Sequence, residues 1–211
     1  KTWLCRRDER GGCVNISNFA ELSEKAYQTA PVTIAIAAAE EPDVIMSAVE
    51  ASAKGLINSA ILTGNSFQIR DLIKRLGVGC SGFEIRHAEN AAEAAILAVR
   101  SIREGSADIL VKGNLDSSLY FKAILDKEKG LRRSELLSNV TVFELPSYHK
   151  LLAVTDNAIV LQPNLMQKQL IIENTKSLFD ALEIPQAKVA VVAAVEKENS
   201  MMPATTDAVE L

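Results

Sequence analysis

The sequence predicts an α/β protein with a mostly parallel, layered sheet, and two observations carry this prediction. Short apolar runs of strand length alternate with longer segments whose apolar residues recur at helical spacing. The helical segments also have the length of crossovers, which makes neighbouring strands run parallel because no tight hairpin joins them. Since parallel sheets are covered on both faces, we expect helices on either side of the sheet.

The first part of the chain sets out this alternation four times. Pro42 stands where a first helical turn tolerates proline, acidic residues beside it favour the positive end of a helix, and Gly55 ends that helix. The other expected helices are residues 19–27, 66–76, 89–104 and 119–125. The expected strands are residues 33–38, 59–63, 82–86 and 108–112.

Beyond residue 140 the pattern changes. Three short strand-like runs, 141–145, 151–155 and 158–161, are separated by turn residues and predict a local antiparallel segment. A helix over 165–182 and a strand over 188–194 follow. The residues after Pro203 indicate the start of a helix without room to complete itself, and we therefore expect the chain to be truncated at its C-terminus.

The domain organisation follows from these patterns. Residues 1–17 are expected to be a disordered arm or a tag, because the chain opens on a polar, basic and aperiodic stretch. Residues 18–140 are expected to form a first α/β lobe, and residues 141–211 the start of a second lobe.

Composition excludes several classes of protein. Lys and Arg number 23 against 27 Asp and Glu, so the net charge of −4 leaves no broad cationic surface for nucleic acid. The longest apolar runs are far shorter than the roughly 20 residues that cross a bilayer. The cysteines Cys5, Cys13 and Cys80 lack metal-ligand spacing and are interpreted as reduced thiols, with a Cys5–Cys13 disulfide as the alternative. The sequence thus predicts a soluble, cytoplasmic protein without a metal site.

A G-x-G-x-x-G motif at residues 77–82 is interpreted as a structural feature. A dinucleotide-binding loop has to follow a strand and open a helix, so that the pyrophosphate meets the helix N-terminus. Here the motif follows an expected helix and leads into an expected strand. A glycine-terminated helix followed by a loop is the simpler interpretation.

The polar turn after the strand at 108–112 is the main candidate for a binding site. In parallel sheets, ligands collect outside the carboxyl ends of strands, and free N–H groups at a helix start attract anions. Gly113 permits close approach of a ligand, and Lys112 and Lys122 carry positive charge for a phosphate oxygen. Ser117 and Ser118 add hydroxyl donors.

Asp116 leaves two interpretations of this turn open. Its carboxylate either caps the following helix or repels the anion that we expect there. A capping loop with a solvated lysine is therefore the alternative to a phosphate site.

Other polar residues give weaker signals. Arg132 and Ser138 mark a cluster in which a guanidinium fork would suit a phosphate, although a solvated turn has the same composition. His87 and His149 are interpreted as surface histidines, and the acids at positions 40 and 41 as helix-start charges.

From about Asn18 onward the chain resembles the phosphate acetyl/butyryltransferase family, and its phosphate butyryltransferase branch in particular. The stretches that carry the resemblance are TIAIAAAE (33–40), AILTGN (60–65), ADILVKGNL (107–115), AILDKE (123–128), GLR (130–132), LS (137–138), FELP (143–146), VTD (154–156), AAVE (193–196), MP (202–203) and DA (207–208).

The resemblance implies a fold, a reaction and partners. The fold is two-lobed, of the isocitrate/isopropylmalate dehydrogenase type, with the active site between the lobes, and the protein is expected to be a homodimer or a higher homo-oligomer. The reaction is the reversible transfer of a short acyl group between coenzyme A and phosphate, so acyl-CoA, phosphate and acyl phosphate are the expected small-molecule partners. No metal or prosthetic group is expected, and coenzyme A is a substrate.

The resemblance also implies which residues bind substrate. They are Lys112, Gly113, Asn114, Ser117, Lys122, Arg132, Ser138 and Glu196. Asp116 and Ser117 stand where the branch commonly has His-Thr, and Lys122 stands where the family has an arginine. The serine, arginine and aspartate that the family is thought to use on the thiol have no counterpart in this sequence, so the catalytic base is not assigned.

Two rival interpretations belong to other classes. The first is a non-catalytic relative, truncated or decayed, that binds coenzyme A or acts as a subunit of an oligomer. The second is a dehydrogenase on the same fold, which requires clustered aspartates for a divalent metal, and the sequence contains no such cluster.

Overall fold

A computed structural model describes residues 16–211, and its contacts divide the chain into two compact units. Unit 2 is Lys25–Arg133, and unit 1 combines the described residues up to Glu24 with Ser134–Leu211. Helix α1 (Phe19–Gln28) crosses from unit 1 into unit 2. Its first turn is tied to unit 1, because the Phe19 N–H donates to Glu144 Oε2 (2.7 Å).

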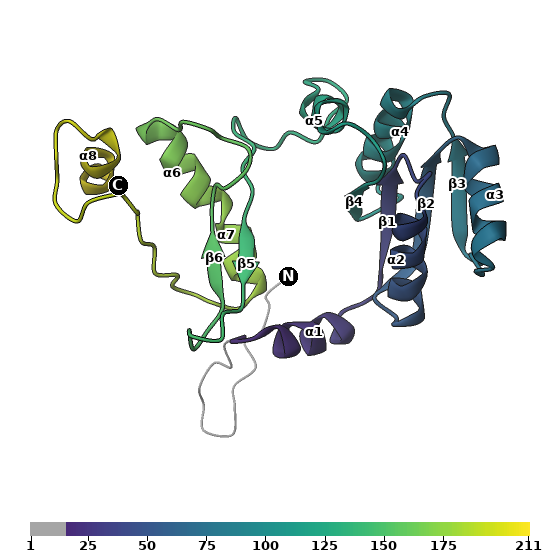
Figure 1. Ribbon diagram of the computed structural model, residues 1–211, viewed down its shortest axis with the longest axis horizontal. Coiled ribbons are helices and arrows are strands. Elements are labelled where there is room, and N and C mark those ends of the chain that lie inside the picture. The colour runs from purple at the N-terminus through teal and green to yellow at the C-terminus, as the bar shows by residue number, and fades with distance from the viewer. Residues whose placement is uncertain (1–15) are drawn as a thin grey trace. The chain divides into compact units, whose positions relative to one another are not determined.

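Unit 2 contains a four-stranded parallel sheet in the order β3-β2-β1-β4, as Figure 1 shows. The strands are β1 (Val32–Ala37), β2 (Ile57–Gly64), β3 (Phe83–His87) and β4 (Ile109–Lys112). The helices are α2 (Pro42–Ala53), α3 (Ser66–Leu76), α4 (Ala91–Arg103) and α5 (Ser117–Leu125). The expected parallel α/β alternation is confirmed.

Helices cover both faces of this sheet. Alternate residues of β1 divide between two cores, with Ile34 and Ile36 packed beneath α2 and α3. Ala35 and Ala37 pack on the other face against α4 and α5. Alanine on that second face allows α4 to approach closely, and its own contact residues are Ala94, Ala95 and Ala98.

Local sequence signals set the helix ends in unit 2. Asn65 and Asn90 accept backbone N–H groups at the first turns of α3 and α4. Gly77 ends α3 in the left-handed conformation (φ 67°), which glycine adopts without the steric cost of a Cβ. The interpretation of the glycine motif as a helix terminus is therefore confirmed.

Unit 1 has little regular structure. Strands β5 (Thr141–Phe143) and β6 (Leu152–Val154) form an antiparallel pair, as the sequence predicts. The helices are α6 (Leu165–Asn174), α7 (Lys176–Ala181) and α8 (Pro203–Glu210). Lys168 on α6 and Asp207 on α8 form a half-buried ion pair with Nζ 2.5 Å from Oδ2.

Two predictions for unit 1 are wrong for local reasons. Residues 158–161 form no strand, because Asp156 Oδ1 accepts the N–H groups of Ala158 and Ile159 and folds the backbone into a turn. The helix expected over 165–182 is divided at Thr175, whose hydroxyl donates to Ile172 O (2.7 Å). Such a side-chain bond competes with the regular helical pattern.

The end of the chain holds one further correction. The strand expected over 188–194 is absent, since these residues follow an irregular path without a neighbouring strand in the described chain. The residues from Pro203 to Glu210 form helix α8, so a helix begins where the sequence predicts one. The Thr205 hydroxyl joins the preceding turn through Asn199 and Met202.

Among residues 16–211, none of the helices combines the length and the apolar character needed to cross a bilayer.

Candidate functional site

The connectivity of unit 2 places a topological switch point where β1 meets β4. The chain passes from β1 outward to β2 and β3, and then returns to place β4 on the other side of β1. After β1 the chain enters α2 on one face of the sheet, and after β4 it enters α5 on the opposite face. In open parallel sheets such a switch point, at the carboxyl ends of the two strands, is where ligands bind.

The turn after β4 is held firmly onto the end of β1. The Gly113 N–H donates to Ala37 O (2.8 Å), and the Asn114 N–H donates to Ala38 O (2.7 Å). A Cβ at Gly113 would overlap these carbonyl oxygens, so the close approach requires glycine. Leu115 is buried and anchors the turn in the core. The backbone at the switch point is therefore preorganised.

The start of α5 is capped by an acid. Asp116 Oδ1 accepts the Ser118 N–H (2.7 Å), and hydrogen bonds from Ser118 hold the pKa of the Asp116 carboxyl below its ordinary value. The positive charge of Lys112 adds to this lowering of the Asp116 pKa. Of the two interpretations left open for Asp116, the structure favours capping.

The amide groups of this turn are therefore mostly engaged. We expected free N–H groups to attract an anion here, but the N–H groups of Gly113, Asn114 and Ser118 all donate to protein oxygens. Exposed side chains remain for ligand binding, namely those of Lys112, Asn114 and Ser117.

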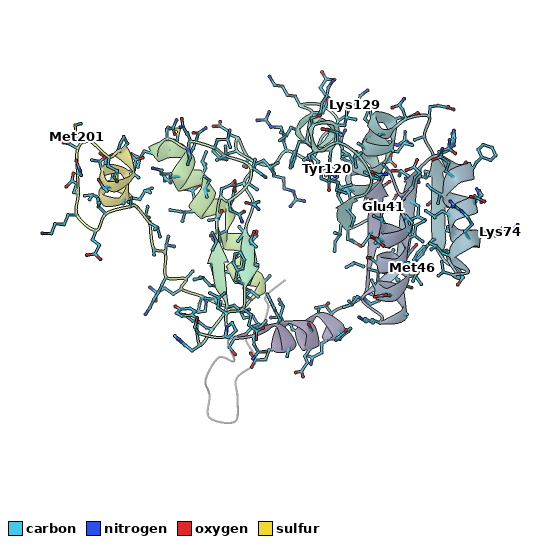
Figure 2. All side chains as sticks on the ribbon, viewed as in Figure 1. Glu41, Met46, Lys74, Tyr120, Lys129 and Met201 are labelled. Atoms are coloured by element: carbon cyan, nitrogen blue, oxygen red, sulfur yellow. The ribbon has the colours of Figure 1, made fainter. Side chains whose placement is uncertain are left out.

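Helix α5 sets the relation between Ser117 and Lys122. Lys122 is exposed in the last turn of the helix. Four residues separate it from Ser118, so these two share a helix face, whereas Ser117 lies on another face. Tyr120 (labelled in Figure 2) fixes the helix on β4, since its hydroxyl donates to Leu110 O (3.3 Å). Burial raises the pKa of Tyr120, which keeps this hydroxyl protonated.

The loop after β1 forms the second wall of the switch point. Ala38 has a left-handed backbone (φ 57°), which is uncommon for a residue with a Cβ. Glu40 Oε1 accepts the Asn65 N–H (2.5 Å), and its carboxylate fills the space beside Gly64. Glu40 therefore supports the turn after β2 through this hydrogen bond. Glu41 is the N-cap residue of α2, which agrees with its interpretation as a charge at a helix start.

A hydroxyl, an imidazole and a carboxylate meet beyond β2. The Ser66 N–H donates to His87 Nδ1 (3.2 Å), and Ser66 Oγ lies 3.1 Å from the same nitrogen. His87 Nε2 lies 3.2 Å from Glu89 Oε1. His87 is thus an exposed histidine with two partners. No local pattern in the sequence indicates these partners, because Ser66 is 21 residues away from His87.

Comparison with known proteins bears on these residues directly. A family profile described as phosphate acetyl/butaryl transferase matches residues 86–211, which include β4, the polar turn and α5. The chain belongs to this family.

Relatives and solved structures of the phosphate acetyl/butaryl transferase family agree. The chain is 38% identical over 179 residues to a probable phosphate butyryltransferase of Bacillus subtilis, covering 85% of this chain and 59% of that protein. It is 34% identical over 196 residues to the phosphate butyryltransferase of Clostridium acetobutylicum, covering 93% and 65%. A branched-chain phosphotransacylase from Enterococcus faecalis superposes with a TM-score of 0.73 at 26% identity, covering 85% of this chain and 62% of that one. The chain thus spans about three fifths of the length of these family members.

The remaining predicted site residues of this family member belong to other segments of the chain than the polar turn. Arg132 is exposed near the end of unit 2. Ser138 belongs to unit 1, where its Oγ accepts a hydrogen bond from Asn174 Nδ2 (2.9 Å). Glu196 is exposed on the irregular segment of unit 1. Within unit 2, the predicted residues from Lys112 to Lys122 belong to one continuous stretch, the end of β4, the polar turn and α5.

A pocket in unit 2 lies beside the switch point and not in the turn. Its lining is mostly apolar and comes from β1, α2, Ile57 of β2 and Val111 of β4, with Glu41 and Asp43 as acidic members. Within residues 16–211, no group of three His, Cys, Asp or Glu side chains is placed to hold a metal ion.

Proposed function

We propose that the protein transfers a short acyl group, butyryl or similar, between coenzyme A and inorganic phosphate. The observation that carries this proposal is the family match, which includes the polar turn at the switch point. Phosphate butyryltransferases are among its most similar relatives. The chain spans only 59% and 65% of the length of these two relatives, so we propose the activity of the relatives for this protein and do not infer it directly from the match.

The reaction needs no covalent intermediate on the protein. Starting from acyl phosphate, the sulfur of coenzyme A attacks the acyl carbonyl carbon and forms a C–S bond. The C–O bond to phosphate breaks, phosphate leaves with the bonding electrons, and the thiol proton goes to a base that we leave unassigned. The protein contributes alignment of the two substrates and neutralisation of phosphate charge.

The side chains of the polar turn are proposed to bind the phosphate. Lys112 supplies charge, and the Asn114 amide and Ser117 hydroxyl supply hydrogen-bond donors, which is consistent with their exposure at the switch point. Gly113 lets the turn approach β1, and Lys122 adds charge from α5. Arg132, Ser138 and Glu196 are proposed as supporting substrate contacts, and the working enzyme as a homo-oligomer without a prosthetic group.

Thioester formation from butyryl phosphate and coenzyme A tests this proposal on the full chain. We expect Lys112→Ala to raise the KM for phosphate in the reverse direction about tenfold, because a charge-assisted hydrogen bond is lost. Lys54→Ala is the matched control, since Lys54 is an exposed lysine at the C-terminal end of α2. Equal KM values for the two variants would remove Lys112 from the site. The same assay on Lys122→Ala tests the second lysine.

A substitution of Asp116 is expected to lower the KM for phosphate, whereas Lys112→Ala is expected to raise it. Asp116→Asn keeps an oxygen for the Ser118 N–H but removes the negative charge of the turn. If phosphate binds at this turn, its KM falls in the variant, whereas a phosphate bound elsewhere leaves the KM unchanged.

The alternative is a non-catalytic relative that binds coenzyme A or serves as a subunit of an oligomer. Calorimetric binding of coenzyme A without any turnover of butyryl or acetyl phosphate would support it against the enzymatic proposal.

A further inference from the structure

Ser66, His87 and Glu89 form a polar cluster at the carboxyl end of the sheet in unit 2. Ser66 is the first residue of α3, which follows β2, whereas His87 ends β3 and Glu89 follows it. The two strands are paired, with Gly64 opposite His87 in their register. β3 and β4 are the outer strands of the sheet, about 14 Å apart across three strand spacings. The cluster is therefore separate from the proposed phosphate site.

The hydrogen bonds of His87 determine which ring nitrogen carries the proton. The Ser66 N–H donates to His87 Nδ1 (3.2 Å), and a backbone N–H can only donate. Nδ1 therefore holds a lone pair, and the ring proton is on Nε2. This Nε2–H then donates to Glu89 Oε1, which lies 3.2 Å away.

Ser66 Oγ faces the basic nitrogen of this ring. It lies 3.1 Å from Nδ1, so the hydroxyl donates its proton to the imidazole. A hydroxyl beside a base, with a third group that orients the base, is the arrangement that activates a serine nucleophile. The Glu89 carboxylate also stabilises the imidazolium that forms when the base takes the serine proton.

The cluster is accessible to a small molecule. His87 and Glu89 are exposed, and Ser66 is half-buried. Phe67 is 77% exposed, and its ring lies edge-on to the imidazole of His87 with the two centroids 6.2 Å apart. The phenyl ring offers apolar surface to the hydrocarbon part of a ligand at Ser66.

The first turn of α3 limits the substrate to activated acyl groups. The N–H groups of Phe67 and Gln68 donate to Asn65 Oδ1, and the Ser66 N–H is engaged by the imidazole. None of these three amides is free to bind the oxyanion of a tetrahedral intermediate. One missing oxyanion donor lowers a rate by about 10²- to 10³-fold. Esters with good leaving groups tolerate this loss, because their carbonyl carbon is more reactive.

From this geometry we infer that Ser66 is a nucleophile that hydrolyses activated short-chain carboxylic esters, with His87 as its base. Ser66 Oγ attacks the ester carbonyl carbon and forms a C–O bond, and the hydroxyl proton moves to His87 Nδ1. The ester C–O bond breaks, and the alcohol leaves with the bonding electrons and takes up this proton. Water then attacks the acyl-serine, and Nδ1 passes the proton of the water to Ser66 Oγ. Ester and water thus give carboxylic acid and alcohol.

A fluorophosphonate probe tests whether Ser66 is activated. Such a probe reacts with a nucleophilic serine hydroxyl, forming an O–P bond with loss of fluoride. Peptide mapping of the labelled full chain should place the adduct on Ser66. Ser106 is the internal control and should stay unlabelled, because it is exposed between α4 and β4 and lies outside the cluster.

Turnover is tested with p-nitrophenyl butyrate. The triple variant Cys5→Ser, Cys13→Ser and Cys80→Ser removes the thiols, which also react with such esters. This chain should release p-nitrophenolate and carry a butyryl ester on Ser66. Ser66→Ala in the same chain should lose both signals.

Substitution of the two histidines tests the base. His87→Gln should slow fluorophosphonate labelling by at least about a hundredfold, because general-base assistance is lost. His149→Gln is the matched control, since His149 is the other histidine of the chain and is exposed. Its labelling rate should equal that of the unaltered chain.

Glu89 is a positioning residue, and its test needs a second measurement. Glu89→Gln should slow labelling about tenfold, because a charge-assisted hydrogen bond to the imidazolium becomes a neutral one. The nitrogen chemical shift of His87 Nε2 should move, since its N–H loses a charged acceptor, while the thermal unfolding midpoint stays constant. A purely structural role would instead lower the midpoint.

Two outcomes would overturn the inference. They are the absence of an adduct on Ser66, and labelling of Ser66 that His87→Gln leaves unchanged. Ser66→Ala should not alter thioester formation from butyryl phosphate and coenzyme A, because Ser66 is not among the proposed phosphate ligands. The inference and the proposed function therefore fail independently.

Discussion

Units 1 and 2 of the same chain are stabilised in different ways. Unit 2 encloses its sheet between two layers of helices, and side chains such as Ile36, Leu62 and Ile69 are completely buried. In the described part of unit 1, the buried apolar residues are only Ile16, Ile171 and Leu182. Unit 1 instead relies on turns, helix caps and one ion pair.

The difference shows what a strand-forming sequence needs. Residues 34–37 and residues 189–195 are both apolar runs, but only the first run has neighbours in the described chain, β2 and β4, that satisfy its backbone. Burial then adds to pairing, since about 25 cal/mol is gained for each Å² of apolar surface removed from water. Where no partner strand is present, the same kind of sequence follows an irregular path.

The largest expected difference in the free energy of unfolding is between alanine substitutions of two leucines, one in each unit. Leu62→Ala in unit 2 should lower the free energy of unfolding by about 2–5 kcal/mol, because the fully buried side chain leaves a cavity. Leu161→Ala in unit 1 should change it by less than about 0.5 kcal/mol, since Leu161 is 94% exposed. Hydrogen exchange of the β1 amides in increasing urea measures the effect of Leu62→Ala on unit 2. Exchange of the β5 amides under the same conditions measures the effect of Leu161→Ala on unit 1. Similar losses would mean that the two units unfold as one.

A pair of glycines sharpens the comparison within unit 2. Gly113→Ala should lower the free energy of unfolding by about 3 kcal/mol, because the new Cβ meets backbone oxygens that have no room to move. Gly79→Ala should be nearly neutral, since nothing lies within 4 Å of a Cβ at that position. Thermal unfolding of both variants measures the difference. A neutral Gly113→Ala would contradict the close approach of the turn to β1.

Much of unit 2 could be predicted because its signals are local. Helix α3 has the predicted bounds, since Asn65 and Gly77 mark its ends within a few residues of the apolar pattern. The failures in unit 1 lie where tertiary or side-chain partners decide. The hydroxyl of Thr175 divides a helix that apolar spacing alone predicts as continuous.

The sequence was sufficient to predict where the candidate site lies, but not which hydrogen bonds its backbone makes. Strand order puts the turn after β4 at the switch point, and the polar residues of that turn are visible in the sequence. The sequence does not show that Ala37 and Ala38 occupy the amide groups of the turn, because those contacts join residues more than 70 positions apart. Glu40 was missed for the same reason, since its partner Asn65 belongs to another loop.

The ion pair of unit 1 is the next smaller test. Asp207→Asn should lower the free energy of unfolding of unit 1 by about 1–2 kcal/mol, because the half-buried Lys168 ammonium loses its charged partner. Asp180→Asn on α7 is the control, since that aspartate is exposed. Hydrogen exchange of α6 reports the effect. Equal exchange rates in the two variants would mean that solvent already separates the pair.

The smallest expected effect concerns pH and the turn that replaces the third predicted strand of unit 1. Partial burial raises the pKa of Asp156, but N–H groups of Ala158, Ile159, Asn139 and Val160 outweigh it, so the net pKa is below the ordinary value. The unfolded chain therefore binds the proton more readily than the folded one. The stabilisation by Asp156 is complete above the unfolded pKa of about 3.9 and is lost as the pH falls through the lower folded pKa.

Amide chemical shifts of Ala158 and Ile159 measure this titration. They should move in one step below about pH 4, when the carboxylate takes up a proton and its hydrogen bonds weaken. Asp156→Asn keeps one acceptor oxygen for these two amides but cannot titrate, so its shifts should stay constant over the same range. An identical step in the variant would assign the titration to another acid and leave the turn of unit 1 without its proposed electrostatic support.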